Sequence, residues 1–167
     1  MVFEGIDIYG RVPEAKTLVF EGIDIYGRMP RPPDKKLPPT VPRVYSAKKI
    51  AFEGTTDTTG KTVVFAGTGW LEEINHVAEI LRSNATVHVE ISAFVGPTWL
   101  AVKLGQELVG NTPAVHRKYG ALMDARAKKV GDMLVLQGID PARIHLSRGE
   151  SGIGEAFRKV EFRFFVP

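Results

Sequence analysis

The hydrophobic positions in the second half of the chain fall into two helical patterns. In residues 71–81, apolar side chains recur every three or four positions, at Leu71, Ile74, Val77, Ala78 and Leu81. Residues 119–137 have the same period, with apolar side chains at Leu122, Ala125, Val130, Met133 and Leu134. Gly138 comes next, and glycine is the usual residue where a helix ends in a left-handed turn. The sequence therefore predicts two amphipathic helices, the second ending just before Gly138.

Other segments have the pattern of β-strands. Residues 86–93 alternate with period two, which places one set on a buried face: Val87, Val89, Ile91 and Ala93. Further strands are predicted at residues 62–65, 143–146 and 158–166. A short helix is expected at 100–110, and Asn111-Thr112-Pro113 is typical of a helix start. Together these elements predict an α/β fold, a mixed β-sheet of about four strands with two main helices.

The N-terminal segment contains an internal repeat. Residues 2–13 recur as residues 19–30 with one change, Met29 in place of Val12. The alternation within each copy favours an extended strand. Such strands could form an edge hairpin of the same domain, or add to the sheet of a neighbouring subunit by β-augmentation. The candidate partner-binding residues of this arm are Val2, Phe3, Ile6, Ile8, Tyr9, Val19, Phe20, Ile23, Ile25 and Tyr26.

A proline-rich stretch separates the repeats from the rest of the chain. Six prolines fall between residues 30 and 42, a composition typical of an extended polyproline spacer. We therefore predict two regions. Residues 1–43 form an extended arm with a linker, and residues 44–167 form the α/β domain.

Composition narrows the function. The net charge of +3 is small, and the basic residues are scattered, so a nucleic-acid partner is not expected. The chain has no cysteine, which excludes disulfides, thiolate metal sites and a lipobox. Its first residues have acids where a signal peptide has basic residues and an apolar run, and no stretch is long enough for a membrane span. Localisation therefore stays open. Association with a virion or another assembly, or synthesis in the cytoplasm, is more consistent with the sequence than export.

Several short motifs resemble one known family, the OmpA C-terminal-like domain. They are Arg126-Ala127 in the long helix, Gly138-Ile139 after it, Gly149-Glu150, and the ending Arg158-Lys-Val-Glu-Phe162. The similarity covers roughly residues 62–166. This family provides the peptidoglycan-binding modules of outer-membrane porins, peptidoglycan-associated lipoproteins and flagellar stators. The resemblance implies the same α/β fold and a peptidoglycan ligand.

The resemblance also implies a ligand site. In the family, a helix arginine and a loop aspartate hold the zwitterionic end of diaminopimelate through charge-assisted hydrogen bonds. Arg126 matches the arginine, whereas the aspartate position falls near Gly96, which has no charge. Arg158 and Asp57 are further candidates, although Asp57 precedes the predicted first strand. The alternative for Arg126 is a structural ion pair with Asp124 or Glu150.

No catalytic constellation is found in the sequence. The four histidines lie on different predicted elements without metal-ligand spacing, and no serine has a nucleophile-elbow context. We therefore expect no enzyme activity, no metal and no cofactor. The favoured hypothesis is a structural protein of a large assembly, such as a phage tail, a contractile injection machine or a motor. In it the domain serves as a docking block and the arm binds other protein subunits. The alternative is a peptidoglycan-binding module that anchors an envelope assembly.

Overall fold

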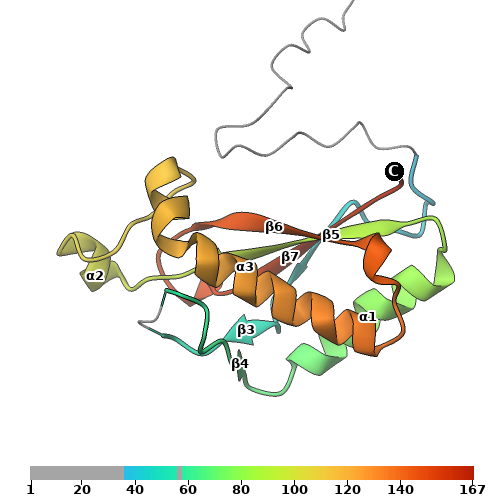
Figure 1. Cartoon of the computed structure of the whole chain (residues 1–167), viewed down its shortest axis with the longest axis horizontal. Coiled ribbons are helices and arrows are strands. Elements are labelled where there is room, and N and C mark those ends of the chain that lie inside the picture. Colours follow the sequence, from blue (N-terminus) through green and yellow to red (C-terminus); the bar gives the residue numbers. More distant parts are fainter. Residues whose placement is uncertain (1–35, 56–57) are drawn as a thin grey trace, which may run out of the picture. The chain divides into compact units, whose positions relative to one another are not determined.

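The computed structural model describes residues 36–55 and 58–167, which form an α/β fold as predicted (Figure 1). The main sheet contains β2 (Val44–Ala47), β5 (His88–Val95), β6 (Ile144–Ser151) and β7 (Val160–Phe165). A separate two-stranded sheet contains β3 (Ala51–Phe52) and β4 (Phe65–Ala66). The helices are α1 (Trp70–Ser83), α2 (Trp99–Lys103) and α3 (Pro113–Leu136), with short 3-10 helices at Pro141–Arg143 and Glu155–Phe157. The repeats of the predicted arm and Asp57 lie outside the described residues.

The main sheet has the strand order β2-β7-β5-β6. β7 is antiparallel to both β2 and β5, and β5 is parallel to β6. A parallel pair needs a crossover connection, and here α3 lies in the chain between the two strands. Residues Val89, Ile91 and Ala93 are fully buried, as the alternation predicts. They belong to one core with the apolar residues of α1 and α3, so both helices cover the same face of the sheet (Figure 1).

The helix ends follow local sequence signals. The Thr112 side chain accepts a hydrogen bond from the Val115 N–H at 3.2 Å, and Pro113 occupies the first turn of α3. At the other end, Gly138 has φ of +92°, the left-handed conformation that the sequence predicts there. The strand after this turn is longer than expected, because β6 continues to Ser151. No described helix is both long and apolar enough to cross a membrane.

The predicted first strand of the sheet is wrong. Only Phe65 of residues 62–65 is in a strand, and it pairs with Phe52 outside the main sheet. Val64 is 48% exposed, so this segment does not contribute a buried strand. Its aromatic residue instead stacks on Trp70 with ring centroids 4.2 Å apart. The fourth strand of the main sheet is β2, whose sequence Val-Tyr-Ser-Ala is too short and too polar to be recognised by period alone.

Part of the proline-rich stretch packs on the domain. Val41 is 6% exposed and belongs to the core, and Leu37 packs against the same core. The Phe164 N–H donates to the Arg43 carbonyl oxygen at 2.9 Å, which extends the pairing beyond β2. Residues 37–43 therefore contribute contacts to the domain. The division of the chain at residue 43 stays a prediction.

Candidate functional site

One face of α3 forms a wall of a small pocket. Tyr119, Leu122 and Arg126 are three and four residues apart, so their side chains lie on the same side of the helix. The other walls come from the segment after β3, the loop after β5, the loop after α2 and Arg158, two residues before β7. The enclosed volume is about 210 Å³. We call this the Arg126 pocket.

Arg126 is a buried cation with few partners. Its side chain is 3% exposed, and Nη1 donates to the Phe94 carbonyl oxygen at 3.1 Å. Its guanidinium carbon lies 5.0 Å from the ring centroid of Phe52, a cation–π contact. Nε has no hydrogen-bond partner, and the described residues place no carboxylate within ion-pair distance of Arg126. A buried charge in this state favours an added acceptor.

The pocket holds a second arginine. Arg158 lies just before β7 and lines the same pocket, with Nε donating to the Gly96 carbonyl oxygen at 2.9 Å. Burial, and secondly repulsion by Arg158, lowers the pKa of Arg126 to about 10. Both causes disfavour positive charge on Arg126. An anion between the two guanidinium groups would relieve both.

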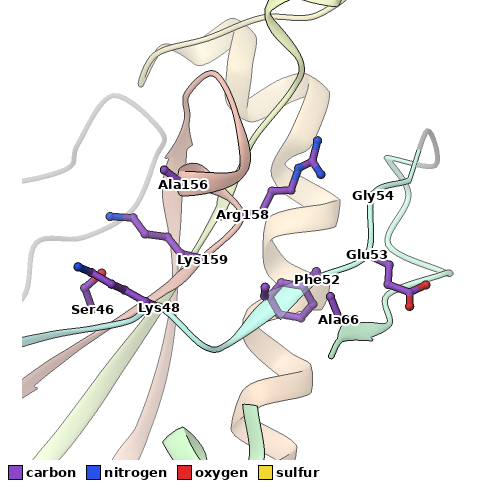
Figure 2. Close-up of a pocket in the computed structure, with 10 residues that line it drawn as sticks. Ser46, Lys48, Phe52, Glu53, Gly54, Ala66, Ala156, Arg158 and Lys159 are labelled. Atoms are coloured by element: carbon purple, nitrogen blue, oxygen red, sulfur yellow. The ribbon is translucent and has the colours of Figure 1, made fainter. Parts of the chain in front are cut away.

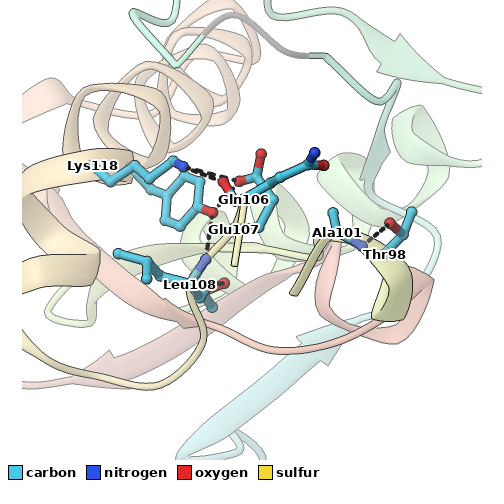
Figure 3. A network of polar contacts seen from close by, with 8 residues as sticks. Thr98, Ala101, Gln106, Glu107, Leu108 and Lys118 are labelled. Atoms are coloured by element: carbon cyan, nitrogen blue, oxygen red, sulfur yellow. Dashed lines mark hydrogen bonds and ion pairs between the residues drawn. The ribbon is translucent and has the colours of Figure 1, made fainter. Parts of the chain in front are cut away.

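A carboxylate lines the same pocket. Glu107, on the loop between α2 and α3, accepts a hydrogen bond from the Tyr119 hydroxyl and lies 3.7 Å from Lys118 Nζ. The Leu108 N–H donates to the Tyr119 oxygen at 3.0 Å, and Lys118 Nζ donates to the Gln106 carbonyl oxygen at 2.6 Å (Figure 3). This network holds the Glu107 carboxylate in the lining that also contains the two arginines. The pocket therefore presents both signs of charge.

Gly96 has a steric reason to lack a side chain. A Cβ at this position would lie 2.2 Å from the Gly154 carbonyl oxygen and 2.9 Å from Arg158 Cγ. No aspartate fits there without movement of the backbone. The acidic group that the resemblance implies at this place is therefore absent, and the acid of this pocket comes from the loop before α3.

The structure brings together only part of the predicted site. Arg126 and Arg158 line one pocket, whereas Asp57 lies outside the described residues, as do the candidate residues of the arm. The structural alternative for Arg126 does not hold at Asp124, because Arg148 binds that carboxylate through two hydrogen bonds of 2.9 and 2.8 Å. Glu107 was missed, since a lone glutamate in a loop has no sequence signal that places it beside Tyr119, 12 residues later in the chain.

Two of the histidines are neighbours, contrary to the expectation from sequence. His88 Nδ1 and His145 Nε2 lie 3.0 Å apart on the paired strands β5 and β6, and their rings stack. Burial, the nearby His145 and Arg143 together lower the pKa of His88. Among the residues that the structure describes, no group of three or more metal-ligating side chains could hold a metal ion.

Comparison with known proteins gives structural matches only. No protein-family model matches the chain, and no curated protein sequence matches it significantly. The periplasmic domain of Helicobacter pylori MotB is similar at 17% identity and a TM-score of 0.48, over 74% of this chain and 78% of that chain. The OmpA-like domain of FopA1 from Francisella tularensis is similar at 15% identity and a TM-score of 0.40, over 70% of each chain.

Proposed function

We propose that the protein is a non-catalytic binding module whose Arg126 pocket takes a carboxylate-bearing end group of a peptide. The observation that carries the proposal is the buried Arg126 guanidinium, with its Nε unsatisfied and no carboxylate partner among the described residues. A guanidinium fork matches a carboxylate through two parallel hydrogen bonds. The ligand class that fits the resemblance is the diaminopimelate-containing stem peptide of peptidoglycan, and binding it would anchor an assembly to the cell wall.

The charges of the pocket suit a zwitterion better than a simple anion. Arg126 and Arg158 would bind the ligand carboxylate, and Glu107 would accept from its ammonium group. The Tyr119 hydroxyl and Lys118 already contact Glu107, which keeps this carboxylate in place before a ligand arrives. The volume of about 210 Å³ fits the end of an amino-acid side chain, not a whole sugar.

The test is calorimetric titration of the full chain with a diaminopimelate-containing stem peptide. Arg126→Met should weaken binding at least tenfold, because it removes a buried charge-assisted pair. Arg117→Gln is the matched control, since Arg117 is an exposed arginine of the same helix and lines no described pocket. Equal affinities of Arg126→Met and the native chain would refute the proposal.

A second variant separates the two halves of the pocket. Glu107→Gln should weaken the peptide with a free ammonium group, and should leave the affinity for the same peptide unchanged once its amine is acetylated. Glu107 is partly exposed, so this variant is expected to keep the fold. A similar loss for both peptides would mean that Glu107 only supports the pocket wall and does not contact the ligand.

We also propose a docking role, favoured by an exposed apolar surface on and after α2. Trp99, Leu100 and Leu104 are each between 58% and 61% exposed, and Leu108 and Val109 after the helix are also exposed. Exposed apolar patches mark interaction sites. The proposed occupant is the repeated segment of another copy of the chain, because residues 2–12 and 19–29 each combine apolar residues with two acids and the surface also carries Lys103.

Sedimentation velocity of the full chain tests this docking role. Self-association that falls with Leu104→Ser, and equally with removal of residues 1–35, would support it. Leu136→Ser is the control, because Leu136 is a 78% exposed leucine at the end of α3. A monomer at all concentrations, or association that is unchanged by Leu104→Ser, would contradict it. The identity of the larger assembly, whether virion, tail, injection machine or motor, stays a prediction.

A further inference from the structure

A second cavity adjoins the Arg126 pocket on the other side of Arg158. Its volume is about 670 Å³, and it lies where β2, β3 and the segment before β7 meet (Figure 2). Phe52 of β3 lines it together with Ala156 of the last 3-10 helix. Arg158 and Gly54 line both cavities, so the two are neighbouring parts of one surface. We call it the lysine cavity.

Positive charge is concentrated in the lysine cavity. Its lining includes Lys48, Arg158 and Lys159, against the single carboxylate of Glu53. In Figure 2 Lys48 and Lys159 extend on the same side of Phe52 as Ser46, and Glu53 lies on the opposite side. The acid of this lining is therefore not placed between the lysines.

One lysine adjoins each strand at the same end of the β2–β7 ladder. The last pair of this antiparallel ladder is Ala47 opposite Val160, so Lys48 and Lys159 are the next residues on the two segments. Lys159 Nζ is partly compensated by Glu161 at 3.1 Å, and it lies 4.9 Å from the Phe94 ring centroid. Lys48 is exposed and has no ion pair within the described part of the chain.

We propose that the lysine cavity is a second anion subsite, which binds a phosphate or carboxylate oxyanion at Lys48 and Lys159, with Arg158 at its border to the Arg126 pocket. The Ser46 side chain also lines the cavity and can donate a further hydrogen bond. The inference rests on the proposed function in one respect. Because Arg158 is shared, a ligand whose end group fills the Arg126 pocket would place a second anionic group in the lysine cavity. The substrate class is therefore a peptide or glycopeptide with two anionic groups.

The first experiment uses inorganic phosphate and the full chain. Backbone amide shifts of Ser46, Lys48 and Lys159 are followed by nitrogen-15 NMR during titration at constant ionic strength. We expect saturable shifts in the native chain, and an increase of the phosphate Kd by about fivefold in Lys48→Gln, the effect of one charged hydrogen bond. Lys61→Gln is the control, because Lys61 is an exposed lysine outside every described cavity. Shifts that do not saturate, or an unchanged Kd in Lys48→Gln, would overturn the proposal.

The second experiment tests whether the lysine cavity binds a carboxylate of the peptide. It also separates this proposal from the proposed function of the Arg126 pocket. A stem peptide is compared with the same peptide in which the carboxylate remote from diaminopimelate is amidated. Amidation should weaken binding to the native chain and have no effect on Lys48→Gln. If amidation weakens both equally, the second carboxylate is bound elsewhere and the subsite does not take it. Lys48 does not line the Arg126 pocket, so loss of the peptide response in Arg126→Met is a separate result.

Discussion

Gly96 illustrates how one residue can decide which side chain supplies a charge. Its backbone passes so close to Gly154 that even a methyl group would overlap the carbonyl oxygen. The two segments of the chain are held together there by two hydrogen bonds. One runs from the Gly154 N–H to the Pro97 carbonyl oxygen at 2.9 Å, and the other from Arg158 to the Gly96 carbonyl oxygen. A charged side chain on this loop would require both contacts to break. The carboxylate that lines the pocket, Glu107, comes from another loop.

Gly96→Ala should lower the free energy of unfolding by about 1–3 kcal/mol, the usual cost of overpacking against backbone that cannot move. Urea denaturation followed by circular dichroism measures it. Gly54→Ala is the control, since its added methyl group would meet only the end of Arg158 at 3.7 Å and should change stability by less than about 0.5 kcal/mol. Equal stabilities of the two variants would show that the loop relaxes freely.

Tyr119 should remain protonated in strong alkali. Burial, and secondly its hydrogen bond to Glu107, raises the pKa of Tyr119 from 10.0 to about 12. A raised pKa means that the folded state holds the proton more tightly, so this stabilisation is complete below pH 10 and is lost as the pH rises towards 12. Tyrosinate absorbance at 295 nm during alkaline titration should lose one late-titrating group in Tyr119→Phe. An unchanged late phase would mean that the phenol is not held by Glu107.

The native chain and Tyr119→Phe can also be compared by the pH dependence of their free energies of unfolding. Between pH 10 and 12 the free energy of unfolding of the native chain should fall more steeply than that of Tyr119→Phe, because only the native chain releases a proton from this site when it unfolds. The pKa of Tyr45 is also raised to about 12, by burial and by Glu73, so a residual slope is expected in the variant. Parallel curves for the two proteins would contradict the assignment.

At the scale of elements, one arginine joins the end of α1 to the start of β6. Arg143 donates to the carbonyl oxygens of Leu81, Asn84 and Val87 at 2.7 to 3.0 Å. These carbonyls belong to the last turn of the helix and the loop before β5, where partners within the helix are lacking. The Arg143 guanidinium therefore binds carbonyl oxygens at the C-terminal end of α1 and ties that end to the start of β6.

Arg143→Met should destabilise the protein by about 2–3 kcal/mol, because it removes the charge-assisted hydrogen bonds to three carbonyl oxygens. Arg143→Lys should have a smaller effect than Arg143→Met, since an ammonium can still donate to some of these carbonyls. It cannot replace arginine fully, because it does not reach all three in the same geometry. Arg82→Met is the control at the same end of α1, where an exposed arginine donates to Gln137 at 3.0 Å. Thermal unfolding of the three variants measures their order of stability. An equal loss of stability in Arg143→Met and Arg82→Met would contradict this account.

The elements themselves were largely predictable from the sequence. The stripe of α1, the alternation in β5 and the left-handed Gly138 are all set by neighbours within a few residues. The failures are of a different kind. β2 is a strand only because β7 offers it a partner more than one hundred residues later, with Val44 opposite Arg163. In the pocket, the positions of Arg126 and Arg158 were predicted from the resemblance. The position of Glu107 depends on the path of a loop, which no hydrophobic periodicity predicts.

At the scale of the whole molecule, the extent of the folded unit can be tested by shortening the chain. Residues 36–43 contribute Val41 to the core, Leu37 at its edge and the Arg43 carbonyl that accepts from Phe164. A chain that begins at residue 44 loses all three contacts at once. A chain that begins at residue 36 keeps them and lacks only the segment with the two repeats.

The chain beginning at residue 44 should therefore unfold at a lower urea concentration than the chain beginning at residue 36. The expected difference is about 2–3 kcal/mol, mainly the burial of one valine side chain together with a backbone hydrogen bond. Val41→Ala in the longer chain separates these terms, because it removes only the apolar contact and should account for about half of the loss. If the two chains are equally stable, residues 36–43 do not belong to the folded unit, and the domain begins at residue 44, where the sequence alone places it.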